Sequence, residues 1–216
     1  MITQKLKMKK VLKNVSFVFL LLKMCIVFGQ VRGTQKLIVI DVGHGGKDSG
    51  AIGINKIQEK DVVLNIANAI LELNNGLKNP LDIYLTRYSD TLISLSDRTR
   101  LAKALKADLF VSLHCNHSDN VNARGVEVYA SHQQNSNLKE SIYIGYKIEK
   151  ALCKEIGYKS RGVKFSNFQV LRETTDLCAS VLLELGFLSN SDEGRYISDS
   201  KSIQLIAKTI LKSMQN

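Results

Sequence analysis

The sequence is poor in proline and in long hydrophobic runs, and both shortages limit what the protein can be. Only one proline, Pro80, occurs among 216 residues, and no linker rich in proline, serine or glycine interrupts residues 34–216. We therefore expect a single domain there, without an attached binding module. Only one apolar run, near the N-terminus, is long enough to consider as a membrane span, which excludes a polytopic membrane protein.

Cysteine is also scarce, and none of the four cysteines belongs to a CxxC pair. Cys115, Cys153 and Cys178 follow residue 30, and an odd number gives an exported chain no disulfide framework. We interpret Cys153 and Cys178 as small buried hydrophobic residues. Cys115 follows His114 and could act as a nucleophile, but strand alternation would point its thiol away from His114 and into the core.

The formal net charge of +10 is unevenly distributed along the chain. Six of the 30 basic residues are lysines in the first 30 residues, which contain no acid, so 24 bases face 20 acids in the remaining 186 residues. This body has no block of lysine and arginine with interleaved aromatic residues. The sequence therefore argues against nucleic-acid binding.

Residues 1–30 have the pattern of an export signal. A positively charged region ends at Lys13, and the apolar run Val15–Leu22 follows, continuing to residue 28 after an interruption by Lys23. The stretch 15–29 is shorter than the roughly 20 residues that span a bilayer. We expect a cleaved signal peptide, with an uncleaved anchor as the alternative. Either way, the protein should be exported, to the periplasm or the cell envelope.

Strand and helix patterns alternate along the rest of the chain. Runs of β-branched residues predict strands, and apolar residues spaced by three and four predict helices. The predicted strands cover residues 36–41, 81–85, 109–113, 125–130, 168–171 and 180–185. The predicted helices cover residues 59–77, 95–106, 138–156 and 200–214. The alternation predicts an α/β fold, a single domain with a mostly parallel twisted sheet and helices on both faces.

Four polar side chains lie near the ends of these elements. His44 follows the first predicted strand in a glycine-rich loop, and Glu59 opens the first helix. His114 follows the third strand, and Glu184 ends the last strand, after an apolar run. Because ligands gather beyond the carboxyl ends of parallel strands, we expect the four side chains to converge.

This residue set is typical of a metal-dependent hydrolase. Two histidines and a carboxylate form a common catalytic zinc site, and a second carboxylate can take a proton from water. Glu184 is a candidate for the second role, because a carboxylate beside a buried apolar strand costs free energy unless it faces a polar site. Each residue alone has a plainer interpretation: His44 as a loop histidine, and Glu59 as an acid that favours the helix dipole. We interpret His117 and His132 as solvated loop residues.

Six blocks of the sequence occur in the order found in a known enzyme family. They are IVIDVGHGGKDSGAIG (38–53), EKDVVLNIANAI (59–70), YLTRYSDTLISLSDRTRLA (84–102), ADLFVSLHCNHSD (107–119), GVEVY (125–129) and NFQVLRETTDLCASVLLELGFLSNSDE (167–193). Together they resemble the zinc-dependent N-acetylmuramoyl-L-alanine amidases, which are bacterial cell-wall hydrolases. The resemblance makes residues 34–216 the catalytic domain.

The resemblance implies a site and a reaction. Zinc would be held by His44, Glu59 and His114, and Glu184 would be the catalytic carboxylate. The bond cut would be the amide that joins N-acetylmuramic acid to L-alanine in peptidoglycan, during wall remodelling or cell separation. No obligate protein partner is implied, and the membrane would be contacted only through an uncleaved signal segment.

Several positions depart from the family pattern or leave a choice open. Val42 and Ser49 stand where the family often has proline, and Cys115 stands where alanine is usual. Asn116 either contacts the substrate or makes a hydrogen bond at the end of a strand. Arg172 either contacts the substrate or forms a surface ion pair. Some family members carry a long insertion whose helix plugs the zinc site. Residues 131–138 leave no room for it, so we expect an open site.

Two alternative functions fit parts of the pattern. A non-catalytic peptidoglycan-binding module would use the same groove, but it predicts the loss of a ligand or of Glu184, and all four residues are present. A zinc hydrolase of another wall specificity, such as a deacetylase or a carboxypeptidase, shares the site chemistry. Only the six ordered blocks argue against that second alternative.

Overall fold

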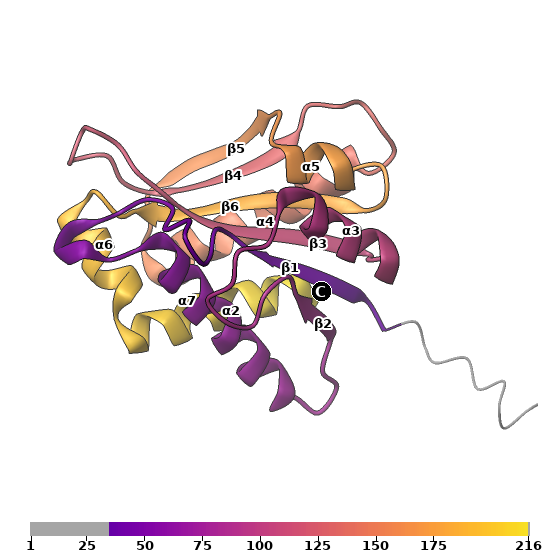
Figure 1. The fold of residues 1–216 in the computed structure, drawn as a ribbon, viewed down its shortest axis with the longest axis horizontal. Coiled ribbons are helices and arrows are strands. Elements are labelled where there is room, and N and C mark those ends of the chain that lie inside the picture. Colours follow the sequence, from indigo (N-terminus) through magenta and orange to yellow (C-terminus); the bar gives the residue numbers. More distant parts are fainter. Residues whose placement is uncertain (1–34, 216) are drawn as a thin grey trace, which may run out of the picture. The chain divides into compact units, whose positions relative to one another are not determined.

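A six-stranded sheet organises residues 35–215, the part of the chain that the computed structural model describes. The strands follow the order β2-β1-β3-β6-β4-β5 (Figure 1). Only the β4–β6 pair is antiparallel among the neighbouring pairs, which confirms the mostly parallel sheet. The strands are β1 (Leu37–Val42), β2 (Asp82–Leu85), β3 (Leu109–Asn116), β4 (Val126–Ser131), β5 (Ser160–Ser166) and β6 (Ala179–Phe187).

Helices cover both faces of the sheet, as expected, but the two layers differ in size. On one face of the sheet, apolar residues of α2, α4 and α7 pack against the strands and form a large hydrophobic cluster. On the other face, apolar residues of α3 and α5 pack against the strands and form a small hydrophobic cluster. The helices are α2 (Glu59–Asn75), α3 (Leu95–Leu105), α4 (Leu138–Ile156), α5 (Gln169–Thr174), α6 (Ser191–Ser198) and α7 (Ser200–Gln215), with a short 3-10 turn, η1 (Ile54–Lys56).

Strand alternation assigns successive residues to opposite layers. In β6, Val181 and Leu183 belong to the large cluster, whereas Leu182 belongs to the small one. In β3, Leu113 and Cys115 belong to the large cluster. Residue 114 therefore points toward the thinner layer, which leaves part of that face free for polar chemistry.

One predicted strand is wrong. Residues 168–171 enter helix α5, in which the Arg172 amide donates to the Phe168 carbonyl at 2.9 Å and Val170 and Leu171 are buried against the small cluster. A run of four residues with three apolar side chains fits either a strand or one helical turn, and its burial against α3 favours the helix here.

Besides the short turn η1, two elements were absent from the prediction. Edge strand β5 contains no fully buried residue, so its sequence lacks the apolar signal of an inner strand. Helix α6 is short, and it begins where the Asn190 side chain accepts hydrogen bonds from the amides of Asp192 and Glu193. The expected signal segment, residues 1–30, lies outside the described residues. Within the described residues, no helix is both long and apolar enough to cross a bilayer.

Candidate active site

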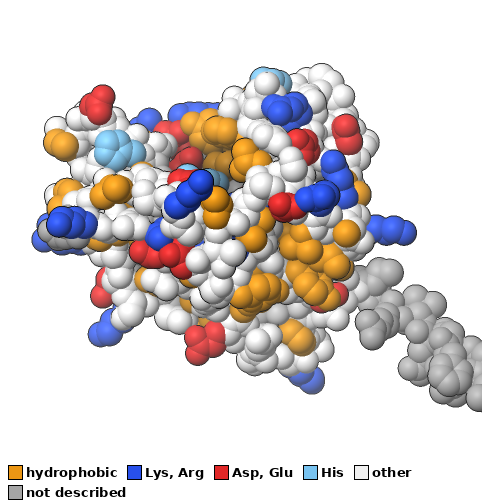
Figure 2. Space-filling model, in the orientation of Figure 1, with side chains coloured by type: hydrophobic (Ala, Val, Ile, Leu, Met, Phe, Trp, Pro, Cys, Tyr) orange, Lys and Arg blue, Asp and Glu red, His pale blue; other side chains and the backbone are white. Residues whose placement is uncertain are grey.

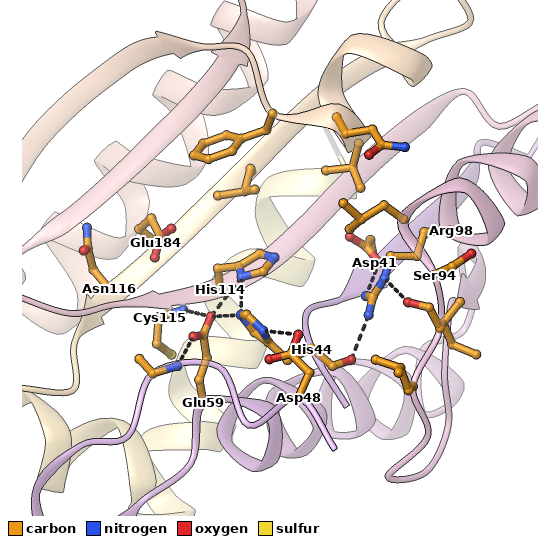
Figure 3. Close-up of a pocket in the computed structure, with 18 of the residues that line it drawn as sticks. Asp41, His44, Asp48, Glu59, Ser94, Arg98, His114, Cys115, Asn116 and Glu184 are labelled. Carbon is orange, nitrogen blue, oxygen red and sulfur yellow. Dashed lines mark hydrogen bonds and ion pairs between the residues drawn. The ribbon is translucent and has the colours of Figure 1, made fainter. Parts of the chain in front are cut away.

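Three of the four predicted site residues meet at one point. His44 lies in the loop after β1, Glu59 is the first residue of α2, and His114 lies within β3 (Figure 3). Glu59 Oε1 lies 3.0 Å from His44 Nε2 and 2.9 Å from His114 Nδ1. The two imidazole nitrogens are 3.1 Å apart. Three ligand-type atoms are therefore directed at a common centre, which can hold a metal ion.

Backbone and carboxylate contacts orient the side chains of this cluster. The amides of Ala51 and Cys115 donate to the two oxygens of Glu59 at 2.8 and 2.9 Å. His44 Nδ1 lies 2.9 Å from Asp48 Oδ2. A carboxylate on the far nitrogen of a metal-binding histidine fixes the orientation of its ring, so Asp48 has the place of such a partner.

The charges within the cluster shift the pKa values of its members. Burial alone would raise the pKa of Glu59, but hydrogen bonds with His114 and His44 outweigh it and hold that pKa well below its usual range. Burial would lower the pKa of His44, but its hydrogen bonds with Glu59 and Asp48 raise it. The carboxylate therefore stays ionised at neutral pH, as a metal ligand must.

Two glycines of the loop after β1 pack directly against the cluster. A Cβ atom on Gly43 would lie 2.7 Å from His114 Nε2, and one on Gly50 would lie 2.5 Å from Glu59 Oε2. Gly50 also has a φ of +64°, which disfavours any side chain. The glycine-rich sequence of this loop thus lets the backbone approach the three side chains closely.

Glu184 lies beside this cluster on the same face of the sheet. It pairs with His114 across β3 and β6 and with Glu127 across β6 and β4, and directly paired residues share a face. Its Oε2 atom is buried and has no hydrogen-bond partner among the described residues. Burial, with smaller contributions from neighbouring carboxylates, raises the pKa of Glu184 to about 7.

A cavity of about 870 Å³ gives access to all four residues. The side chains of His44 and His114 remain 22% and 20% exposed. Leu92, Leu95 and Phe168 are exposed at its apolar side. In Figure 2, hydrophobic side chains flank acidic and histidine side chains in the upper middle of the visible face. The cavity can therefore admit a substrate with both apolar and polar parts.

Cys115 is not available as a nucleophile. Its side chain is buried in the large cluster on the α2 side of the sheet, as strand alternation predicts. Burial, together with the charges of Glu59 and Glu184, raises its pKa well above the usual value, so the thiol stays protonated.

The two possible substrate contacts occupy different places. Asn116 lines the cavity, and its Oδ1 accepts a hydrogen bond from the His117 amide at 2.9 Å, which matches the strand-end interpretation. Arg172 donates to the carbonyl and the side chain of Asn167 at 3.0 and 3.1 Å rather than to an acid. His132 is exposed, whereas His117 lines the cavity.

The sequence analysis missed three residues that contact the loop bearing His44. Asp48 contacts the His44 ring, and Arg87 and Arg98 donate to the loop backbone. Asp48 follows His44 by four residues. That spacing brings two side chains together on a helix, but this segment is a loop, so the spacing alone did not predict the contact. The two arginines lie in the block at 84–102 that carried the resemblance, but nothing in their spacing showed that they would be buried.

The chain is similar to known proteins of one family. Residues 38–216 match the family model described as N-acetylmuramoyl-L-alanine amidase. The endolysin of Bacillus phage SPP1 is 36% identical over 183 residues, covering 81% of this chain and 63% of the relative. The amidase LytC of Bacillus subtilis is 37% identical, covering 72% of this chain and 30% of the relative. The chain spans between 34% and 63% of the length of the first four curated relatives.

Solved structures share the fold. The catalytic domain of CwlV, an amidase from Bacillus (Paenibacillus) polymyxa, is 36% identical with a TM-score of 0.75, covering 83% of this chain and 96% of that domain. An N-acetylmuramoyl-L-alanine amidase from Clostridium difficile 630 is 30% identical with a TM-score of 0.76, covering 84% of this chain and 96% of that chain. The described domain thus corresponds to nearly the whole of either structure.

Proposed function

Because the chain belongs to the N-acetylmuramoyl-L-alanine amidase family, we propose that it hydrolyses the amide bond between N-acetylmuramic acid and L-alanine in peptidoglycan. One observation carries the proposal: a His-Glu-His cluster and a half-buried carboxylate with a raised pKa line the same open cavity. A binding module has no need of this combination, whereas metal-assisted hydrolysis of an amide uses both parts.

His44, Glu59 and His114 are the proposed ligands of a zinc ion. Ligand atoms of tetrahedral zinc at about 2.0–2.1 Å lie about 3.3 Å from one another. The three atoms here are 2.9 to 3.1 Å apart, so small movements suffice to fit them to the ion. Two imidazoles and one carboxylate also leave a position open for water. Bound zinc supplies Lewis acidity, which polarises a carbonyl and lowers the pKa of a water molecule.

Glu184 is the proposed general base and acid. Its free Oε2 atom accepts a proton from the attacking water and then returns it to the leaving nitrogen of L-alanine. A pKa near 7 suits both steps at neutral pH, and a neighbouring cation would lower that value somewhat. Water adds across the amide, so the products are a lactyl carboxylate and a stem peptide with a free amino terminus.

The proposed place of action is the cell envelope. Peptidoglycan lies outside the cytoplasmic membrane, and residues 1–30 have the pattern of an export signal, cleaved or retained as an anchor. We propose that the site works without an activating partner, since the two histidine side chains keep about a fifth of their surface exposed.

Digestion of isolated peptidoglycan tests the proposed reaction. The zinc-loaded chain should release stem peptides that begin with L-alanine, which mass spectrometry detects, and a chelator should abolish the release. Intact wall despite bound zinc would favour a binding module. Deacetylated sugars or shortened stem peptides would identify a hydrolase of another specificity.

A further inference from the structure

Two arginines lie almost fully buried beneath the loop that carries His44. Arg87 is 3% exposed and Arg98 is 2% exposed. Neither guanidinium donates to the side chain of His44, Glu59 or His114; both donate mainly to backbone carbonyls. Burying a guanidinium is unfavourable unless its donors are satisfied, so the groups that accept its hydrogen bonds indicate its role.

Arg98 binds the backbone on both sides of Gly43. Its Nη2 donates to the His44 carbonyl at 2.7 Å, and its Nη1 donates to the Val42 carbonyl and, at 2.8 Å, to Asp41 Oδ1. Figure 3 shows this ion pair next to the metal cluster. Asp41 is in turn held by the Ser112 hydroxyl, which donates to its Oδ2 at 2.6 Å. Arg98 is therefore fixed at one end by β1 and at the other by the loop.

Arg87 connects two of the three segments that supply the proposed metal ligands. Its Nη2 donates to the Gly43 carbonyl at 2.8 Å and to the Lys60 carbonyl at 2.7 Å, and its Nε donates to the Val42 carbonyl at 3.1 Å. Gly43 precedes His44, and Lys60 follows Glu59. One guanidinium thus sets the distance between the loop after β1 and the first turn of α2.

The backbone of His44 needs such support. Its φ is 57°, in the left-handed region, which is unfavourable for a non-glycine residue. This conformation persists only if the surroundings hold it. The two arginines bind the carbonyls of residues 42, 43 and 44, and the bond to the His44 carbonyl comes directly from Arg98.

We propose that Arg87 and Arg98 are positioning residues that hold His44 and Glu59 together at the proposed metal site. They hold consecutive carbonyls so that His44 Nε2 faces Glu59 Oε1 at 3.0 Å. The inference rests on the proposed function, because it takes this cluster to be the metal site. Lysine cannot replace either residue, since its single ammonium lacks the planar fork that reaches two or three acceptors together.

Zinc affinity of the full chain tests the inference without relying on activity. Arg87→Lys and Arg98→Lys should each raise the zinc dissociation constant about 10- to 100-fold, the usual effect of losing a residue that orients metal ligands. The measurement is competition against a chelating dye at pH 7. Urea unfolding of the metal-free variants, run in parallel, gives their loss of stability.

Asn74→Ala is the matched control. Asn74 is also 3% exposed, and its side chain makes two hydrogen bonds to Leu81, at 2.8 and 2.9 Å. It lies 15 residues beyond Glu59, or about 22 Å along α2. Its loss should destabilise the fold and leave zinc affinity unchanged. Equal zinc affinity in the wild-type chain and both arginine variants, or equal weakening in Asn74→Ala, would overturn the inference.

A milder variant covers the case in which the lysine variants do not fold. Ser112→Ala removes one of the two hydroxyls that hold Asp41 beneath Arg98, and the Thr86 hydroxyl, which donates to Asp41 Oδ1 at 2.9 Å, remains. This variant should raise the zinc dissociation constant about threefold, the effect expected from losing one modest hydrogen bond. An unchanged dissociation constant would also overturn the inference. A wild-type chain that binds no zinc would overturn the metal site itself, and this inference with it, which separates the two failures.

Discussion

The two faces of the sheet use the same strands for different purposes. The face under α2, α4 and α7 is packed by one large apolar cluster that includes residues of all three helices. The face under α3 and α5 has a much smaller cluster, and His114 and Glu184 point toward this thinner layer. In β3 and β6, side chains that stabilise the fold therefore alternate with side chains that face the cavity.

This difference predicts which property each substitution changes. A side chain directed to the large cluster should affect the free energy of unfolding and leave zinc binding intact. A polar side chain directed to the cavity should affect zinc binding or turnover, and its removal should cost little stability. The following substitutions test that division, beginning with the largest effect.

Glu184→Gln should lower the turnover of peptidoglycan by a factor of about 100 or more, because glutamine cannot accept the proton of the attacking water. Zinc affinity should remain close to the wild-type value, since Glu184 lies outside the proposed ligand set. Release of soluble stem peptides gives the rate. Glu149→Gln is the control, a carboxylate buried on the α4 side of the sheet, and it should retain full activity. Wild-type rates in Glu184→Gln would remove Glu184 from the mechanism.

Leu183→Ala should lower the free energy of unfolding by about 2–5 kcal/mol, because it leaves a void in the large cluster. Leu182→Ala, the adjacent residue on the cavity side, should cost less, because water can fill the space that opens next to the cavity. Urea unfolding in the presence of a chelator compares the two. Equal losses would contradict the difference between the faces.

The pH dependence of stability should reveal the cost of keeping Glu184 buried. Its pKa is about 7 in the fold and about 4.5 ordinarily, so between these pH values the metal-free folded chain binds more protons than the unfolded chain. The free energy of unfolding therefore falls as pH rises through this window. In Glu184→Gln, which has no carboxyl group at this position, the free energy of unfolding should not show this decrease.

Relative to the wild-type chain, Glu184→Gln should thus gain on the order of 2–3 kcal/mol between pH 4 and pH 8. Urea unfolding of both chains at pH 4, 6 and 8, with a chelator present, measures the gain. Comparison of the two chains cancels the contribution of Glu59, whose lowered pKa acts in the opposite direction, at lower pH. A difference that does not vary with pH would show that the Glu184 pKa is not raised.

The smallest effect is expected for Cys115→Ala. The thiol is buried in the large cluster, so its loss should cost about 1 kcal/mol of stability and change turnover by less than about twofold. Rates on peptidoglycan and urea unfolding measure both quantities. A loss of activity as large as that of Glu184→Gln would instead support a nucleophilic thiol.

The sequence predicted the elements that form the inner part of the fold. Strands β1, β3 and β6 consist of apolar runs, and α2, α4 and α7 have clear helical spacing, so their positions were correct to within a few residues. The edge strand β5 was missed because its residues are half-buried or exposed. Residues 168–171 were assigned to a strand because a run of four residues is too short to show helical periodicity. Packing against α3 decides its conformation.

The ligand-type residues of the candidate site were predictable from the sequence, whereas the residues that hold them in position were not. His44, Glu59 and His114 were expected to converge, and they do, because parallel strands bring their carboxyl ends to one edge. His114 and Glu184 lie inside longer strands than predicted, which pairs them directly. Arg87 and Arg98 were missed, because burial of an arginine depends on carbonyls from distant segments that no local pattern shows.

X-ray absorption at the zinc edge of the metal-loaded full chain tests the central claim most directly, namely that His44, Glu59 and His114 form the metal centre. The account predicts a first shell of nitrogen and oxygen atoms at about 2.0–2.2 Å, with two imidazoles and no sulfur. In His114→Ala, one imidazole should disappear from that shell. A sulfur neighbour at about 2.3 Å, or a shell unchanged in His114→Ala, would contradict the account.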